Sequence, residues 1–162
     1  MVRRFDYENE RSFKISKQQY FNALSKISEV SHMPFIRAID TFTIVQKWFS
    51  EESLPNGITK RSRIRRCVSK YGKSYEYTTK YYLKNNRIEI NSSVEEQEYN
   101  ILDSIIHKDI VPEIKLRVML EDTETGIKYS ADIKEGENDV TIEVEFSDAK
   151  ERENFVVPKW LS

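Results

Sequence analysis

The sequence predicts a mainly-β, α+β fold: an antiparallel β-barrel of about eight strands with a charged lumen and two to three flanking helices. Alternation of polar and apolar residues, which is typical of β-strands, recurs in about eight segments along the chain. The connections between these segments are short, which favours antiparallel pairing. Each segment has one apolar face, and the opposite faces together carry both acids and bases.

Composition limits the class of protein. A chain of 162 residues, 38% hydrophobic and 33% charged, is long enough for one compact domain, which we expect to span residues 1–162. Its 26 basic and 27 acidic residues nearly balance, which argues against binding nucleic acid by bulk charge. A single cysteine, Cys67, fits a reducing compartment. No apolar run suggests secretion or membrane spanning, so we expect a cytoplasmic protein without a membrane partner.

The segment 140–146 shows the pattern most clearly. In an extended strand Thr141, Glu143 and Glu145 share one face, and the residues between them share the other. Two carboxylates about 7 Å apart repel each other, so their arrangement favours a nearby cation. A solvated outer face of an edge strand is the alternative interpretation.

The same alternation places the other strands. We expect them at 5–15, 35–49 (one bent strand or two short ones), 60–68, 75–83, 87–91, 113–120 and 127–133. Within 60–68, Arg63 and Arg65 lie on one face, opposite Ile64. Their planar guanidinium groups suit phosphate oxygens.

Helical spacing predicts three helices. The first runs from the N-cap Ser16 to about residue 29, and the second, 94–107, is capped by Ser92 or Ser93. A short third helix covers 148–154. The expected buried stripes are Tyr20, Phe21, Leu24 and Ile27 in the first helix and Val94, Ile101, Leu102, Ile105 and Ile106 in the second.

Two arrangements of the charged faces are open. They could face solvent, with the core between the apolar faces and the helices. Alternatively they line a closed barrel, which then has to hold water, metal and a polyanion, because each unpaired buried ion costs several kcal/mol. The charged positions comprise seven acids and seven bases: Glu8, Glu10, Glu76, Glu89, Asp132, Glu143 and Glu145, and Lys14, Arg63, Arg65, Lys80, Arg87, Lys115 and Arg117.

These residues resemble a known family. The segment from Glu8 to Phe13 is similar to the N-terminal Glu-x-Glu-x-Lys signature of the CYTH superfamily, the triphosphate tunnel metalloenzymes. The order continues over nearly the whole chain with Val45-Gln46-Lys47-Trp48-Phe49, Arg63-Ile64-Arg65, Thr79-Lys80, Arg87-Ile88-Glu89, Lys115-Leu116-Arg117, Asp132, Glu143-Val144-Glu145 and Pro158-Lys159-Trp160-Leu161. The family fold is an eight-stranded antiparallel tunnel.

The resemblance implies hydrolysis of a triphosphate with Mg²⁺ or Mn²⁺. By position, Glu8, Glu10, Glu143 and Glu145 would hold the metal, since hard cations take oxygen ligands. The resemblance implies catalytic roles for Glu8, Glu10, Lys14, Glu89 and Asp132. It implies phosphate binding by Arg63, Arg65, Lys80, Lys115 and Arg117.

Three features depart from the family pattern. Ser12 stands where the signature has lysine, with Lys14 on the same strand face. Asn91 stands where many members have a second glutamate after Glu89. The sequence ends at Ser162, where members continue into Gly-x-Glu-Val-Thr.

Several functions are therefore considered. The leading one is a triphosphatase acting on inorganic tripolyphosphate, thiamine triphosphate or a nucleoside triphosphate. The alternatives are a class IV-type adenylate cyclase, an RNA 5′-triphosphatase with a basic track, and a non-catalytic module that binds polyphosphate or nucleotide. The track would comprise Lys60, Arg61, Arg66, Lys70 and Lys73. A homodimer formed through apolar outer strand faces is also open.

Overall fold

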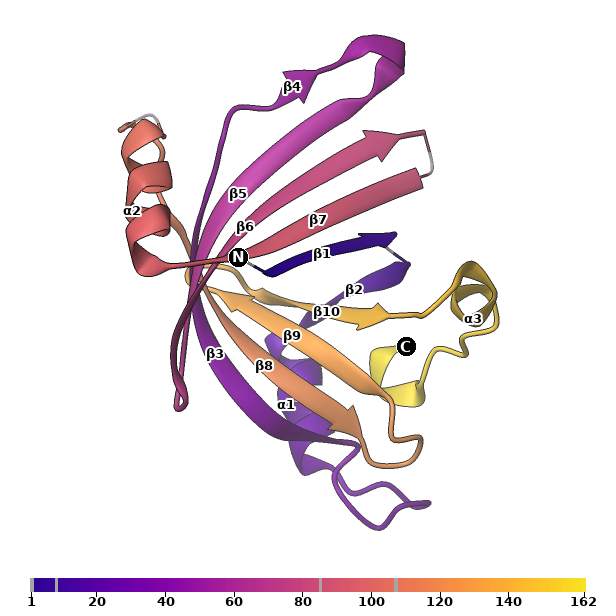
Figure 1. Cartoon of the computed structure of the whole chain (residues 1–162). Helices are drawn as coiled ribbons and strands as arrows, with labels where there is room; N and C mark the ends of the chain where they lie inside the picture. The colour runs from indigo at the N-terminus through magenta and orange to yellow at the C-terminus, as the bar shows by residue number, and fades with distance from the viewer. Residues whose placement is uncertain (1, 8, 85, 107) are drawn as a thin grey trace. The chain divides into compact units, whose positions relative to one another are not determined.

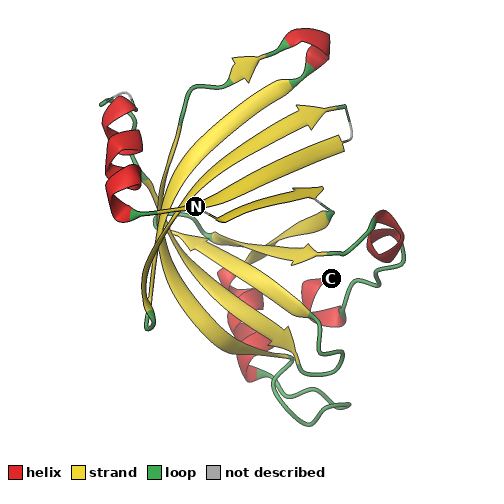
Figure 2. Ribbon diagram, in the orientation of Figure 1, coloured by secondary structure: helices red, strands yellow, loops and turns green. Residues whose placement is uncertain are grey.

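The computed structural model describes residues 2–7, 9–84, 86–106 and 108–162, and its chain is mainly antiparallel β-structure (Figures 1 and 2). Its contacts divide the chain into a first unit, Met1–Glu8 with Thr43–Ile114, and a second unit, Asn9–Phe42 with Lys115–Ser162. Each unit is described by itself. The expectation of one domain stays a prediction.

In the second unit, the first half of β3 (Ile36–Trp48) begins a sheet that continues through β8 (Glu113–Asp122), β9 (Lys128–Lys134), β10 (Asp139–Glu145) and β2 (Glu10–Ser16). The pairs β8–β9, β9–β10 and β10–β2 are antiparallel. One face of this sheet packs against α1 (Lys17–Ser25) and the short 3-10 turn η2 (Lys159–Leu161) to form the core. Ile142 and Leu120 are completely buried there, and Trp160 donates a hydrogen bond to the buried Asp122 at 2.9 Å.

In the first unit, the sheet order is β1 (Val2–Tyr7), β7 (Asn86–Val94), β6 (Gly72–Leu83), β5 (Thr59–Ser69) and the second half of β3. A two-residue strand, β4 (Glu52–Ser53), pairs with β5, and the turn η1 (Pro55–Gly57) follows it. Helix α2 (Glu96–Ile105) contacts β5 and β6. Helix α3 (Ala149–Glu153) belongs to the second unit.

The strand and helix predictions are confirmed with local corrections. The expected strand 5–15 is divided, because β1 pairs with β7 in one unit and β2 pairs with β10 in the other. With this division and β4, the described residues form ten strands where about eight were expected. Within the expected 35–49, where one bent strand or two short ones were predicted, a single long strand, β3, runs from Ile36 to Trp48.

Hydrogen bonds identify the N-cap residues of α1 and α2. The Ser16 hydroxyl accepts from the backbone N–H of Gln19 at 3.1 Å, as predicted for the first helix. The prediction of Ser92 or Ser93 as the second cap is wrong, because both residues lie in β7. Glu95 caps α2 through a reciprocal capping box with Glu98.

The predicted buried stripes are partly wrong. In α1, Tyr20 and Ala23 are buried, whereas Phe21 and Ile27 are exposed, and the helix ends at Ser25 because the following residues form a turn with an isolated bridge to Pro34. None of the residues of α2, all of them described, is buried, whereas Val94 and Ile106, the two members of the predicted stripe that flank the helix, are buried. The helices of the described residues are all too short or too polar to cross a bilayer.

Replacing Ser16 with alanine tests the first cap. The change removes the acceptor for the Gln19 N–H, and we expect it to lower the free energy of unfolding by about 1 kcal/mol. Urea unfolding followed by circular dichroism measures the change. Ser104→Ala is the control, since that hydroxyl donates to the Ile101 carbonyl within α2 and caps no helix start. Equal stability of Ser16→Ala and the wild type would contradict the role of Ser16.

Candidate functional site

The strand register of the first unit gathers polar and basic side chains on one face of its sheet. Arg63 lies opposite Thr78 on β6 and Trp48 on β3, and Arg65 lies opposite Glu76 and Gln46. On β6 and β7, Thr78 pairs with Asn91 and Lys80 with Glu89. Directly opposed residues of antiparallel strands share a face. We call this the basic face; it comprises Gln46, Trp48, Arg61, Arg63, Arg65, Glu76, Thr78, Lys80, Glu89 and Asn91.

Arg65 is held rigidly on the basic face. Its Nε and Nη2 both donate to the side-chain oxygen of Gln46, at 2.9 and 2.7 Å, and both residues are buried. The Gln46 amide therefore holds the Arg65 guanidinium group in a fixed orientation on this face.

Arg63 lies beside Arg65 and is 8% exposed. Its Nη2 is 3.9 Å from a Glu76 carboxylate oxygen, a distance at the outer limit of an ion pair. Its Nε–H is buried and has no hydrogen-bond partner among the described residues. Its guanidinium carbon lies 5.3 Å from the centre of the Trp48 ring, and that of Arg61 lies 4.1 Å from it. An unpaired buried donor on a cation favours an incoming anion.

A hydrogen-bonded chain crosses the rest of the basic face. The Thr78 hydroxyl lies 3.0 Å from a Glu76 carboxylate oxygen and 2.6 Å from the side-chain oxygen of Asn91. The Asn91 amide donates to Glu89 at 2.7 Å, and Glu89 is 3.6 Å from the Lys80 ammonium. Asn91, a departure from the family pattern, thus connects β6 to the carboxylate that orients Lys80.

The second unit has its own charged face, opposite the core. Asp132 accepts two hydrogen bonds from Arg117, at 2.7 and 2.8 Å, and lies 2.7 Å from the Lys115 ammonium. Burial raises the pKa of the Asp132 carboxyl, but hydrogen bonds and the charges of Arg117 and Lys115 outweigh it and lower the pKa to about 2. A carboxylate with so low a pKa is a poor general base. Asp132 contacts both cations and orients them on this face.

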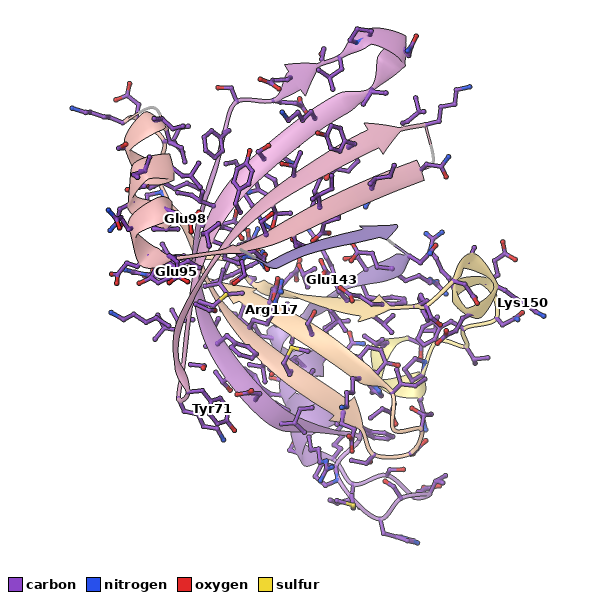
Figure 3. All side chains as sticks on the ribbon, in the orientation of Figure 1. Tyr71, Glu95, Glu98, Arg117, Glu143 and Lys150 are labelled. Carbon is purple, nitrogen blue, oxygen red and sulfur yellow. The ribbon has the colours of Figure 1, made fainter. Side chains whose placement is uncertain are left out.

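Three glutamates share this charged face. Glu145 on β10 lies directly opposite Glu10 on β2, and Glu143, which is labelled in Figure 3, lies opposite Ser12. Like charges at opposed positions destabilise a strand pair unless a cation neutralises them. Lys14 lies on the same face opposite Thr141, two pairs away from Glu143 and Ser12.

These glutamates suit a divalent metal by the type of their donor atoms. Carboxylate oxygens are the donors that Mg²⁺ and Mn²⁺ take. Among the described residues, however, no three His, Cys, Asp or Glu side chains are grouped closely enough to hold an ion. The glutamates share a face, and their side chains would have to turn toward one another to ligate a cation. The predicted ligand Glu8 lies outside the described residues.

The predicted site residues thus fall into two sets. The basic face of the first unit has Arg63, Arg65, Lys80 and Glu89, and the charged face of the second has Glu10, Lys14, Lys115, Arg117, Asp132, Glu143 and Glu145. Gln46 and Thr78 had no predicted role, although both lie at the centre of hydrogen-bonded groups. Both are polar residues on the same strand faces as the basic residues, and this pattern in the sequence could have identified them.

Neither family models nor curated proteins match the sequence, whereas solved structures match the fold. The PH1819 protein from Pyrococcus horikoshii OT3 aligns with a TM-score of 0.57 at 16% identity, over 90% of this chain and 82% of that one. A candidate adenylate cyclase from Bacillus halodurans aligns with a TM-score of 0.57 at 15% identity, over 92% and 85% of the two chains. The chain has a CYTH-like fold.

The CYTH-like fold confirms the resemblance to the triphosphate tunnel metalloenzymes inferred from the sequence, and with it the mainly-β antiparallel class. The inorganic triphosphatase NE1496 also aligns, at 18% identity over 94% of this chain and 82% of that one, with a TM-score of 0.49. Because that score is below 0.5, the fold assignment rests on the two preceding structures. At these identities the likeness concerns the fold alone.

Proposed function

We propose that the protein is a divalent-metal-dependent hydrolase of triphosphates: inorganic tripolyphosphate, thiamine triphosphate or a nucleoside triphosphate. The observation that carries the proposal is Arg63, a buried cation whose Nε–H has no partner among the described residues, beside Arg65, whose charge is oriented by a neutral amide. Such a pair supplies donors and positive charge to a bound phosphate. The CYTH-like fold supports the same class of substrate.

The residues have distinct roles in this proposal. Arg63, Arg65 and Lys80 bind phosphate oxygens from the basic face. Their donors neutralise charge that develops on the transferred phosphoryl group. The phosphate-binding roles that the sequence resemblance implies for Lys115 and Arg117, in the second unit, stay predictions. Glu89 keeps Lys80 in place and accepts from Asn91.

The proposed cofactor is Mg²⁺ or Mn²⁺, which would supply charge neutralisation and a more acidic bound water. Glu10, Glu143 and Glu145 would hold it, and the role predicted for Glu8 lies outside the described residues. Glu10 and Glu145 lie directly opposite each other, an arrangement that suits a cation.

The alternative functions would use the same phosphate-binding residues, and no contact among the described residues favours any of them over hydrolysis. The predicted RNA track is divided, because Arg66 lies on the opposite face of β5 from Arg61. Adenylate cyclase and a non-catalytic binding module become outcomes of the test. The homodimer and the cytoplasmic location stay predictions.

The deciding experiment measures orthophosphate and pyrophosphate release from tripolyphosphate, ATP, GTP and thiamine triphosphate with Mg²⁺ or Mn²⁺. We expect metal-dependent turnover of at least one substrate, lost in Arg65→Ala. Pyrophosphate with cyclic AMP would indicate the cyclase instead. Triphosphate binding without turnover, weakened by Arg65→Ala, would indicate a binding module. Absence of both binding and turnover would overturn the proposal.

Replacing Glu143 with glutamine tests the metal assignment. The amide keeps the shape but loses the charge, so we expect the Mn²⁺ concentration for half-maximal turnover to rise about tenfold or more. Metal titration at saturating tripolyphosphate measures it. Glu137→Gln, in the exposed turn between β9 and β10, is the matched control and should leave the titration unchanged. An unchanged titration in Glu143→Gln would exclude Glu143 as a ligand.

A further inference from the structure

A cavity lies in the first unit, on the face opposite the basic face. It has a volume of about 520 Å³, within the range of small-molecule sites. Its floor is formed by alternate residues of β6 and β7, and its wall by helix α2. The lining residues are Tyr77, Thr79, Tyr81, Ile90, Ser92, Val94, Glu98, Ile101 and Leu102.

The cavity exists because α2 is attached to the sheet from one side. Tyr99 packs on Tyr75 with ring centres 5.0 Å apart, and one turn later Asp103 forms an ion pair with Lys47 at 2.8 Å. These contacts hold one flank of the helix. The neighbouring flank, with Glu98 and Ile101, overhangs the sheet without sealing it, and Ile101 is 60% exposed. The exposure of Ile101, which was predicted to be buried, is therefore a consequence of how α2 is attached.

The cavity has the chemistry of a cation site. Two tyrosines, Tyr77 and Tyr81, line its floor, and Tyr77 is held by an edge-on contact with Phe49 whose ring centroids are 6.0 Å apart. Among the described residues that line the cavity, Glu98 is the one ionisable carboxylate, and none is a lysine, arginine or histidine. Aromatic faces and a carboxylate both attract a cation, and the aliphatic residues favour an apolar body.

Glu98 is fixed in position by the capping box. One of its carboxylate oxygens accepts from the Glu95 backbone N–H at 3.1 Å, and the side chain is half-buried at the start of α2 (Figure 3). The carboxylate is thus oriented before any ligand arrives, which reduces the entropy lost on binding.

We propose that this cavity binds an organic ammonium ion with an aromatic or aliphatic body, whose charged group lies against Glu98 and the tyrosine rings. The site is separate from the basic face, because the side chains of β6 and β7 that line it alternate with those of the phosphate site. Binding of the ammonium ion therefore does not compete with tripolyphosphate.

The test uses three probes of similar shape: 2-phenylethylammonium, 2-phenylethanol and phenylacetate. Titrations followed by amide NMR shifts give the dissociation constants and the location. We expect the ammonium ion to bind about tenfold tighter than the alcohol, with shifts in β6, β7 and α2, and phenylacetate to bind weakest. Saturating tripolyphosphate should leave the ammonium affinity unchanged.

Glu98→Gln is the decisive variant, because glutamine also completes a capping box and α2 is retained. We expect it to remove the preference for the ammonium ion and to leave the alcohol unaffected. Glu96→Gln, which removes a charge from the first turn of the same helix outside both the cavity lining and the capping box, is the matched control and should keep the preference. Equal binding of ammonium and alcohol, an unaffected Glu98→Gln, or shifts outside this cavity would overturn the proposal. So would a concentration-dependent dimer that protects the cavity residues.

Discussion

Replacing Asp132 with asparagine is expected to lower the free energy of unfolding by about 3–5 kcal/mol. Asp132 is 5% exposed and accepts hydrogen bonds from both Arg117 and Lys115. The amide would lose the negative charge and place an N–H₂ group against these donors. Two cations, one of them the buried Lys115, would then lose the Asp132 carboxylate.

Urea unfolding at pH 7 measures this loss. Asp139→Asn, on the exposed start of β10, is the control and should change stability by about 0.5 kcal/mol or less. A loss below about 1 kcal/mol in Asp132→Asn would show that the cluster is solvated and contributes little.

The pH dependence of the wild type provides an independent check. The folded-state pKa of Asp132 is about 2, below its unfolded value of 3.8, so its ionised form stabilises the fold. This contribution, about 2 kcal/mol from the pKa difference, is fully present above about pH 4 and is lost as the pH falls through 2. We expect the unfolding free energy of Asp132→Asn to lack this component. Parallel pH profiles of variant and wild type would contradict the assignment.

Replacing Arg63 with methionine is expected to reduce kcat/KM for the preferred triphosphate about a hundredfold or more, because one preorganised donor to the phosphoryl group is lost. The same change should leave the unfolding free energy equal or higher. Methionine keeps the packing against Trp48, and it removes a buried Nε–H that has no partner among the described residues.

The opposite directions of these two effects distinguish a binding residue from a structural one. Direct titration with tripolyphosphate measures the affinity even where turnover is absent. Arg66→Met is the matched control: Arg66 lies on the same strand, faces the other way, and also has a buried Nε–H without a partner among the described residues. We expect it to keep tripolyphosphate affinity. Equal loss in both variants would indicate a general charge effect, and a loss of stability in Arg63→Met would indicate a structural role.

The sequence alone determined the strands, their faces and the family resemblance, because the direction of each side chain follows from the local period of two. Arg63, Arg65 and Lys80 therefore share the predicted face, and the opposite face has the tyrosines. The cap at Ser16 was predictable for the same reason, since capping is decided within one turn.

Only the tertiary structure decided which charges meet. Gln46 orients Arg65, and Asp132 contacts both Arg117 and Lys115. These contacts depend on the register between strands that are distant in the sequence. The tertiary structure also decided which helix residues are buried. Helical spacing shows an apolar stripe in α2, but the contacts of Tyr99 and Asp103 with the sheet turn Ile101 toward solvent and open a cavity beneath it. Side-chain direction is a local property of the backbone, whereas register and helix attachment are set by contacts between distant segments.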